Sequence, residues 1–465
     1  MNKSINPATG QPYKIVWFGD MVGLSGFGRI GNEVTKRLSQ RGYVVQGAAI
    51  NYTGWPVRHN LDHIWPLGGQ DMWNGLVNIV NSFQPDLIIS CQDFPYHQTI
   101  WNGCKIDFSK VKWVFITPID GTPIHPDWVK ICDFADGRMV ISKFGVEALR
   151  QVGKRVDLCH PGVDVGEFFP ATAEDKKSLR EAAGYSESDY IVGSMCMNQG
   201  RKAIPPMIAA FHEFAKDKPE AKLMLDMDSV SPAGWDIPSL LTQMGWTDEE
   251  KKRVKYRQDL FVKDGKQNEE MLPLRNRYCL LDTHMVISHR EGFGLPLMES
   301  MACGIPTMAL DWCSGTEIVG EGRGYVVKKI EYMENGTWGG AKDAFPDMTN
   351  LVEGLNYFYQ NKESASAIAK KGLEWAAKNT WDVSADQVEA VIQTALSRSR
   401  TEKPKHDSNF VVPTPGGNLS DTVGRVGKTP DPVSDNPIVQ QPQESVTVPE
   451  LPNGDGARGG EGGAA

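Results

Sequence analysis

Two glutamates flank a glycine-containing loop within residues 288–319, and the residue types of this segment suit the binding of a phosphorylated sugar. Glu291 precedes Gly292–Gly294, and Glu299 follows with seven residues between the two acids. Pro296 favours the first turn of a helix, where its missing N–H is not needed. The loop and helix start therefore offer unpaired N–H groups to a diphosphate. The two carboxylates can accept hydrogen bonds from vicinal hydroxyls.

The elements that must position this loop follow an α/β pattern. Short apolar segments alternate with amphipathic stretches, which is typical of parallel sheets covered by helices on both faces. The chain begins with a predicted strand at Lys14–Gly19, a glycine-rich loop through Gly28, a helix over Ile30–Gln40 and a strand over Val44–Asn51. Further predicted strands of this series are Asp86–Ser90, Trp113–Thr117, Gly137–Ser142 and Arg155–Cys159. A second series comprises Tyr190–Met195, Lys222–Asp226, Met285–Ser288 and Pro306–Leu310. We therefore predict two doubly wound Rossmann-like domains.

The predicted domain boundary lies in His160–Pro170, a segment whose proline and glycine content suits a hinge. The two domains are then residues 1–165 and 166–381. Residues 382–400 are predicted to form a terminal helix, capped by Asp382 and packed back on the first domain. Residues 401–465 are rich in Pro, Gly, Ser and Asp, and we expect this tail to be disordered.

Composition narrows the class of protein. The chain has 465 residues, of which 40% are hydrophobic and 23% charged, so it can bury a sizeable core. A net charge of -9 argues against coating nucleic acid by bulk attraction. No segment reaches the apolar length of a membrane span, and we expect a cytoplasmic protein. The eight cysteines are scattered singly, which favours reduced, buried thiols over a structural zinc site.

Residues 291–306, EGFGLPLMESMACGIP, resemble the donor-site signature of retaining glycosyltransferases of family four, the group 1 enzymes with the GT-B fold that include glycogen synthase and phosphatidylinositol mannosyltransferases. The resemblance extends over nearly all of residues 14–400. Its further matches are Ser25–Gly28, SKFGVEALRQVG at Ser142–Gly153, HPGVDVGEFFP and RKAIPPMIAAFHEF. It implies transfer of a hexose from a UDP- or GDP-sugar with retention of anomeric configuration. The first domain would then bind the acceptor and the second the nucleotide sugar.

The resemblance also implies roles for residues of the second domain. Glu299 would bind the donor ribose, while Glu291 and the loop amides of Gly292, Phe293, Gly294 and Leu295 would face the donor sugar. Lys202 falls at the position where the family uses a lysine to neutralise the diphosphate. The arginine usually found five residues earlier is replaced by Met197, and we expect Arg201 to supply the charge.

Candidates in the first domain are less specific. In relatives a histidine often follows the fifth strand and faces the reacting sugar, whereas ITPIDG here places Asp120 near that position. Asp120 could equally be an ordinary turn aspartate. Asp93 and His97 follow the fourth strand and are weaker acceptor-side candidates, since a lone histidine is more often structural. Ser25 and Gly26 are expected to offer their amides to donor phosphate or acceptor.

Several alternatives stay open or are set aside. Gly26, Gly28 and Gly31 form G-x-G-x-x-G, but the second strand ends without the acid that would hold a dinucleotide ribose. Asp226 and Asp228 superficially resemble a metal-binding pair, yet we expect neither a metal nor another cofactor. A nucleotide-sugar epimerase, a phosphorylase and a non-catalytic sugar-binding protein remain alternatives. The acceptor is open: a saccharide, a lipid-linked sugar, a protein or a modified base in DNA.

Overall fold

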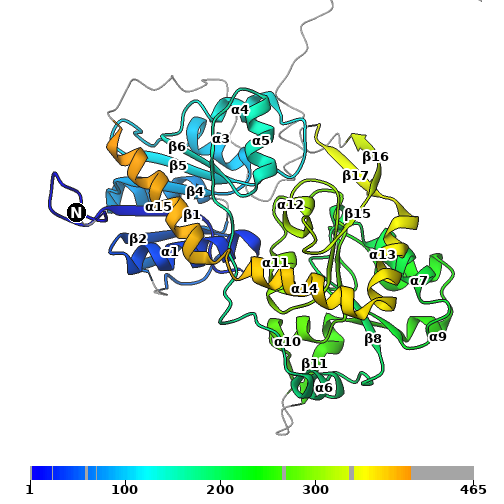
Figure 1. Ribbon diagram of the computed structural model, residues 1–465. Coiled ribbons are helices and arrows are strands. Elements are labelled where there is room, and N and C mark those ends of the chain that lie inside the picture. Colours follow the sequence, from blue (N-terminus) through cyan, green and yellow to red (C-terminus); the bar gives the residue numbers. More distant parts are fainter. Residues whose placement is uncertain are drawn as a thin grey trace, which may run out of the picture. The chain divides into compact units, whose positions relative to one another are not determined.

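The computed structural model describes residues 3–398 apart from 24, 58–60, 70, 264–268 and 335–339, so the predicted tail at 401–465 lies outside the described residues. Two parallel sheets carry the fold, as predicted (Figure 1). The first has the order β3-β2-β1-β4-β5-β6-β7, and the second the order β10-β9-β8-β13-β14-β15. In each sheet the strand order reverses beside its first strand, which is the arrangement of a doubly wound domain.

The strands of the first sheet are β1 (Lys14–Asp20), β2 (Val44–Ile50), β3 (His63–Pro66), β4 (Leu87–Cys91), β5 (Lys112–Thr117), β6 (Gly137–Val140) and β7 (Asp157–Leu158). Those of the second sheet are β8 (Tyr190–Met195), β9 (Ala221–Asp226), β10 (Val254–Tyr256), β13 (Thr283–Val286), β14 (Thr307–Leu310) and β15 (Tyr325–Val327). Two antiparallel hairpins are formed by β11 (Phe261–Lys263) with β12 (Glu269–Met271), and by β16 (Lys329–Glu334) with β17 (Lys342–Pro346).

The helices are α1 (Gly26–Gln40), α2 (Met72–Phe83), α3 (Phe94–Asn102), α4 (Pro126–Ile131), α5 (Lys143–Gln151), α6 (Ala173–Ala182), α7 (Ile204–Phe214), α8 (Ile237–Gln243), α9 (Asp248–Lys251), α10 (Leu274–Cys279), α11 (Leu295–Ala302), α12 (Gly315–Val319), α13 (Met348–Gln360), α14 (Lys362–Ala376) and α15 (Trp381–Ser397), with 3-10 turns η1 (Gly200–Lys202) and η2 (Arg257–Leu260). Within the described residues, no helix is long and apolar enough to cross a membrane.

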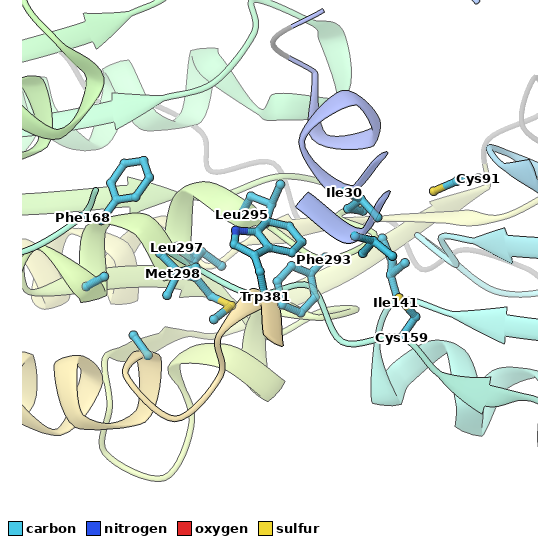
Figure 2. Close-up of a cluster of buried hydrophobic side chains, with 14 of the residues drawn as sticks. Ile30, Cys91, Ile141, Cys159, Phe168, Phe293, Leu295, Leu297, Met298 and Trp381 are labelled. Carbon is cyan, nitrogen blue, oxygen red and sulfur yellow. The ribbon is translucent and has the colours of Figure 1, made fainter. Parts of the chain in front are cut away.

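Alternating side chains of β1 place a hydrophobic core on each face of the first sheet. Ile15 and Trp17 belong to a core that also contains residues of α1 and α15, whereas Val16 and Phe18 pack with residues of α2, α3 and α5. The core on the α1 side continues without interruption into α11 of the second domain. Figure 2 shows Phe293 and Leu295 gathered around Trp381, with Ile30 of α1 nearby. The loop at Gly292–Gly294 is therefore anchored on apolar side chains from both domains.

The chain crosses between the two sheets twice. His160–Pro170 is irregular, as its composition predicts, and Val163 forms an isolated parallel bridge with Thr380. Gly162 lies so close to this second crossing that an added Cβ would be 2.2 Å from the Trp381 nitrogen. After the crossing, α15 returns to the first sheet and contacts α1, β5 and β6 (Figure 1).

Several predicted boundaries were wrong. Helix α1 begins at Gly26 and not at Ile30, because Ser25 caps it and the glycines fit its first turns. Strand β13 ends at Val286, before the predicted limit at Ser288. Asp382 lies inside the first turn of α15, whose N-cap is Thr380. The strand β3 and the hairpin β16–β17 were not predicted. All eight cysteines are free thiols, and seven of them are buried.

Candidate active site

The loop between β13 and α11 is shaped by glycine and held by a serine. Gly294, the N-cap of α11, has φ +96, a left-handed conformation that glycine adopts without strain. An added Cβ on Gly292 would lie 2.7 Å from Pro118 Cβ in the first domain, so only glycine fits this approach. The Ser314 hydroxyl donates toward the carbonyl oxygens of Glu291 at 2.9 Å and Phe293 at 2.6 Å. The loop N–H groups are thereby kept at the amino terminus of α11.

Three groups surround the carboxylate of Glu291. Lys202 Nζ donates to Glu291 Oε2 at 2.5 Å, Ser288 Oγ donates at 3.0 Å, and Arg201 lies 3.6 Å away. Burial by itself raises the pKa of Glu291, but the charges of Lys202 and Arg201 outweigh it and lower the pKa to about 2. Arg201, which we expected to supply the charge missing at Met197, lies beside the same carboxylate as Lys202. The structure thus brings three predicted residues into one charged cluster.

Glu299 lies in a separate, buried environment on α11. Tyr278 donates its hydroxyl to Glu299 Oε2 at 2.7 Å, and Arg29 of α1 forms an ion pair with Oε1 at 3.0 Å. Burial raises the pKa of Glu299, and the Arg29 charge opposes this rise. Glu299 therefore sits in the second turn of the helix and interacts with the first domain, while Glu291 interacts with η1.

The amino end of α1 faces this region from the first domain. Ser25 accepts a hydrogen bond from the Gly28 amide at 3.0 Å, and its hydroxyl donates to Asp20. An added Cβ on Gly26 would be 3.8 Å from Leu295 Cδ1. The predicted residues Ser25 and Gly26 thus lie near the start of α11, although the Ser25 side chain is used to cap its own helix.

A pocket opens at the ends of β4 and β5. Asp120 Oδ2 lies 3.7 Å from Arg290, which also pairs with Asp343 of β17 at 2.5 Å. The hairpin β16–β17 reaches this pocket from the second domain, since the Lys342 amide donates to the Thr122 carbonyl at 3.0 Å. The pocket is lined by Asp93, Phe94, Pro95, Pro118, Ile119, Asp120, Gly121, Pro123, Ile124, Trp128 and Ala341.

His97, proposed on sequence as an acceptor-side residue, is wrongly assigned. Its side chain is fully buried, stacks on Phe115 at 5.1 Å between ring centroids, and shares a 2.9 Å hydrogen bond with Ser90. Burial lowers the pKa of His97 to about 3, so the ring is neutral. Because α3 turns this side chain onto the sheet, His97 belongs to the core, whereas Asp93 lines the pocket.

The Asp226 carboxylate is already occupied by arginines. Arg257 donates to Asp226 Oδ1 at 2.9 Å, and Arg277 donates to Oδ2. Asp228 is 75% exposed and lies 3.7 Å from the same Arg257. The superficial metal-pair pattern at this strand end therefore corresponds to an ion-pair network that orients η2 and α10.

Sequence reasoning missed Arg29, Tyr278 and Arg290. Arg290 immediately precedes Glu291, so its position beside the predicted loop was a usable signal. Arg29 lies one turn after the Ser25 cap, but its partner on another domain could not be read from spacing. The hairpin β16–β17 also gave little signal, because its strands carry exposed apolar residues such as Ile330 and Met333.

Comparisons with known proteins agree with this arrangement. Residues 261–375, which include Glu291 and Glu299, match the family Glycosyl transferases group 1. A Corynebacterium glutamicum GDP-mannose-dependent monoacylated alpha-(1-6)-phosphatidylinositol monomannoside mannosyltransferase is 27% identical over 36% of this chain and 41% of its own length. A D-inositol 3-phosphate glycosyltransferase of Segniliparus rotundus is 28% identical over 34% of this chain and 32% of its own length. The matches span less than half of either relative.

Solved structures share the fold over most of the chain. Anabaena Alr3699/HepE, determined with UDP and glucose, has a TM-score of 0.63 at 16% identity and covers 82% of this chain and 100% of its own. Sucrose-phosphate synthase from Thermosynechococcus elongatus has a TM-score of 0.63 at 16% identity, with coverage of 83% and 100%. The two parallel-sheet domains are therefore those of the GT-B glycosyltransferase fold. More specifically, residues 261–375 are similar to the family Glycosyl transferases group 1.

Proposed function

We propose that this protein is a glycosyltransferase that moves a hexose from a nucleotide-sugar donor to an acceptor with retention of anomeric configuration. The observation that carries the proposal is the cluster of Glu291, Lys202 and Arg201 at the amino terminus of α11. This cluster lies at the carboxyl ends of β8 and β13, where doubly wound sheets bind ligands.

The donor diphosphate would bind to Lys202, Arg201 and the amides of Gly292–Gly294. Phosphate oxygens can replace Glu291 as the partner of the two cations, and they complement the positive end of the α11 dipole. Glu291, released from part of its ion pair, would accept a hydroxyl of the donor sugar. Glu299 would accept the ribose hydroxyls, since its carboxylate lies on the next turn of α11.

In the transfer step the bond between the anomeric carbon and the leaving phosphate oxygen breaks, and a bond from the acceptor oxygen to that carbon forms. The nucleotide diphosphate leaves with additional negative charge, which Lys202, Arg201 and the loop amides stabilise. The acceptor hydroxyl gives its proton to the leaving phosphate oxygen or to water, so the step balances. Asp120, whose carboxylate lies 3.7 Å from Arg290, would contact the transferred sugar or the acceptor, and we assign no nucleophile.

We propose that no metal or other cofactor takes part, because Lys202, Arg201 and the α11 dipole supply the positive charge that a diphosphate requires. Turnover should therefore persist after dialysis against EDTA. Loss of turnover that manganese restores would overturn this part of the proposal.

The test is incubation of the full chain with UDP-glucose, UDP-galactose, UDP-N-acetylglucosamine, ADP-glucose and GDP-mannose. Release of nucleotide diphosphate with transferred or free sugar identifies a transferase. An epimerised donor identifies an epimerase, and binding without any product identifies a sugar-binding protein. Formation of sugar 1-phosphate from inorganic phosphate and a glycoside would identify a phosphorylase.

Two variants connect this activity to the site. Lys202→Met should lower nucleotide diphosphate release about 100-fold, which corresponds to the few kcal/mol typical of one charge-stabilising group. Glu299→Gln should mainly raise the donor Kd. Lys216→Met is the matched control, because Lys216 is 61% exposed and pairs only with Glu213 among the described residues. Folded Lys202 and Glu299 variants that bind and turn over every donor like the parent would disprove the proposal.

The acceptor class needs separate evidence. One curated relative is named for D-inositol 3-phosphate, and that polyol phosphate is an obvious acceptor to test. A saccharide, a lipid-linked sugar, a protein and a modified base in DNA are the other candidates.

A further inference from the structure

Glu317 of α12 joins the second domain to the start of helix α5 in the first. Its Oε2 atom accepts hydrogen bonds from the backbone N–H groups of Lys143 at 2.8 Å and Phe144 at 3.3 Å. These N–H groups belong to the first turn of α5 and have no partner inside the helix. The Gly145 amide is bound by the N-cap side chain of Ser142 at 3.1 Å. A carboxylate of one domain therefore completes the helix cap of the other.

The second oxygen of this carboxyl group faces His160, in the segment that crosses between the domains. Glu317 Oε1 lies 3.6 Å from His160 Nε2, and both side chains are less than a tenth exposed. The other ring nitrogen, Nδ1, lies 3.1 Å from the carbonyl oxygen of Pro161. Because a carbonyl oxygen can only accept, Nδ1 carries a hydrogen, and Nε2 of the neutral ring is an acceptor. Two buried acceptors therefore face each other, and among the described residues Glu317 Oε1 has no hydrogen-bond partner.

One proton between these two atoms removes the conflict. Burying an acceptor without a partner costs free energy, and 3.6 Å is longer than a hydrogen bond. A proton on either atom allows a hydrogen bond of about 2.8 Å. Burial lowers the pKa of His160 to about 4 and raises the pKa of Glu317, which favours the proton on Glu317. The charged groups that face the pair, Lys143 and Arg323, and the amides of Lys143 and Phe144 oppose the rise at Glu317.

Both partners of this contact also touch the structure around the loop Gly292–Gly294. Helix α12 follows Ser314, whose hydroxyl donates to the Phe293 carbonyl oxygen at 2.6 Å. Glu317 is one helical turn beyond Ser314. The His160 ring meets the Phe293 ring edge-on, with 4.7 Å between the centroids. The contact between Glu317 and His160 therefore links the start of α5 to this loop.

We propose that Glu317 is a positioning residue, and that a proton shared with His160 keeps the start of α5 and the loop Gly292–Gly294 aligned for transfer of the sugar. The inference rests on the proposed function, in which the second domain binds the donor and the first binds the acceptor. Loss of the proton at high pH leaves a buried carboxylate beside an imidazole lone pair. The contact then weakens. Transfer falls more than donor binding, because Lys202 and the loop amides belong to the second domain alone.

Glu317→Gln tests the proton, because the amide imitates a protonated carboxyl group. Its oxygen can accept from the amides of Lys143 and Phe144, and its NH2 group can donate to His160 Nε2 at any pH. Turnover is measured as nucleotide diphosphate release at pH 5.5 and pH 8.5, with a donor that wild type binds and the acceptor that it uses, or water. Relative to wild type, the rate of Glu317→Gln should be about 1 at pH 5.5 and about 5 at pH 8.5. Because this readout is a ratio, titration of other groups affects both proteins alike.

Two further variants separate positioning from folding. Glu317→Met loses both acceptors and should slow turnover about tenfold at both pH values, while the donor Kd from calorimetry changes less than about threefold. His160→Phe keeps an aromatic ring beside Phe293 but has no ring nitrogen, so in this background the pH-dependent advantage of Glu317→Gln should disappear. Glu249→Met, at a side chain that is 82% exposed, is the control and should match wild type.

Hydrogen exchange reads the contact without any donor. The first turn of α5 should exchange about fivefold faster in Glu317→Met than in wild type, because two amides lose their acceptor. Unchanged exchange in this variant, or a rate ratio of Glu317→Gln to wild type that is equal at the two pH values, would overturn the inference. If donors bind and that ratio is flat, the positioning role fails and the proposed function stands. If no nucleotide sugar binds to wild type, the proposed function fails, and the positioning role fails with it.

Discussion

Two neighbouring parts of the candidate site, the cluster at the start of α11 and the pocket at the ends of β4 and β5, shift the pKa of a carboxyl group in opposite directions. In the cluster, Glu291 is held by Lys202 at 2.5 Å, and its pKa is lowered to about 2. In the pocket, Asp93 has no such partner among the described residues, and burial together with Asp120 raises its pKa to about 7. The same kind of side chain therefore has its pKa shifted in opposite directions at neighbouring strand ends.

This difference separates two kinds of binding environment. In the cluster, Glu291 holds Lys202 and Arg201 in place, which avoids leaving Lys202 buried and unpaired; in the proposed function a phosphate would replace it. In the pocket, Asp93 has no internal partner among the described residues, which favours a group that donates hydrogen bonds. Arg290 lies between the two, since it pairs with Asp120 and Asp343 next to the loop at Gly292–Gly294.

Removing Arg290 should have the largest effect on the free energy of unfolding, because this buried guanidinium pairs with both Asp120 and Asp343. Arg290→Met leaves Asp120 and Asp343 without the guanidinium that is 8% exposed between them. We expect a loss of about 3 kcal/mol in the free energy of unfolding, the scale found when one partner of a buried pair is removed. Denaturant unfolding measures it.

The matched control for this substitution is Arg150→Met. Arg150 is 69% exposed and pairs with Glu147 on the surface of α5. Exposed pairs contribute about 0.5 kcal/mol, so the control should stay near wild type. A loss below 1 kcal/mol in Arg290→Met would show that this arginine does not hold the acids of the pocket.

The fold was predictable because its signals are local. Strand β8 is found at its predicted bounds, Tyr190–Met195, since a short apolar run between turn residues has few alternatives. Strand β3 was missed because His63–Pro66 has only four residues and ends in proline. Helix α1 starts four residues before the prediction, because three glycines obscured a helix that Ser25 caps.

The approach of Glu291 to Arg201 and Lys202 at the ends of β8 and β13 was predictable, because short segments of the sequence carry these residues. Glu299 lies apart from them, with Tyr278 and Arg29. The misassigned His97 shows the limit of this reasoning. Asp93, the N-cap of α3, lines the pocket, whereas His97, four residues later, is buried in the core. Arg29 could not be predicted either, because its contact with Glu299 joins residues of different domains.

Asp93→Asn should change how the free energy of unfolding depends on pH. The folded state raises the Asp93 pKa from 3.8 to about 7, so it holds this proton more tightly than the unfolded chain. Stability from this group is therefore present at low pH and is lost as pH rises toward 7. About three pKa units would correspond to about 4 kcal/mol, and partial solvent access reduces the expected effect to about 2 kcal/mol.

The measurement is unfolding of wild type and Asp93→Asn at pH 5 and pH 8.5. The variant should gain about 1.2 kcal/mol over wild type on going from the lower to the higher pH, because Asn does not ionise and part of the effect is already present at pH 5, above the unfolded pKa. The charged groups that face Asp93 are Asp120, Arg201 and Arg290, and all three are retained in the variant. An equal difference at both pH values would show that Asp93 is ionised normally in the folded protein.

The smallest effect is expected on the donor side, at the pair between Arg29 and Glu299. Arg29→Gln removes a charge that lowers the Glu299 pKa, while the hydrogen bond from Tyr278 remains. The carboxylate then takes up a proton at a higher pH and loses its ability to accept the donor ribose hydroxyls. Donor Kd, measured by calorimetry, should rise about threefold more between pH 8 and pH 6 in the variant than in wild type, or about 0.7 kcal/mol. Arg37→Gln on the same helix is the control, because Arg37 pairs with Glu33 and Asp382. If wild type and Arg29→Gln show the same ratio of Kd values, Glu299 is not coupled to α1, and the donor half does not depend on the first domain for its charge.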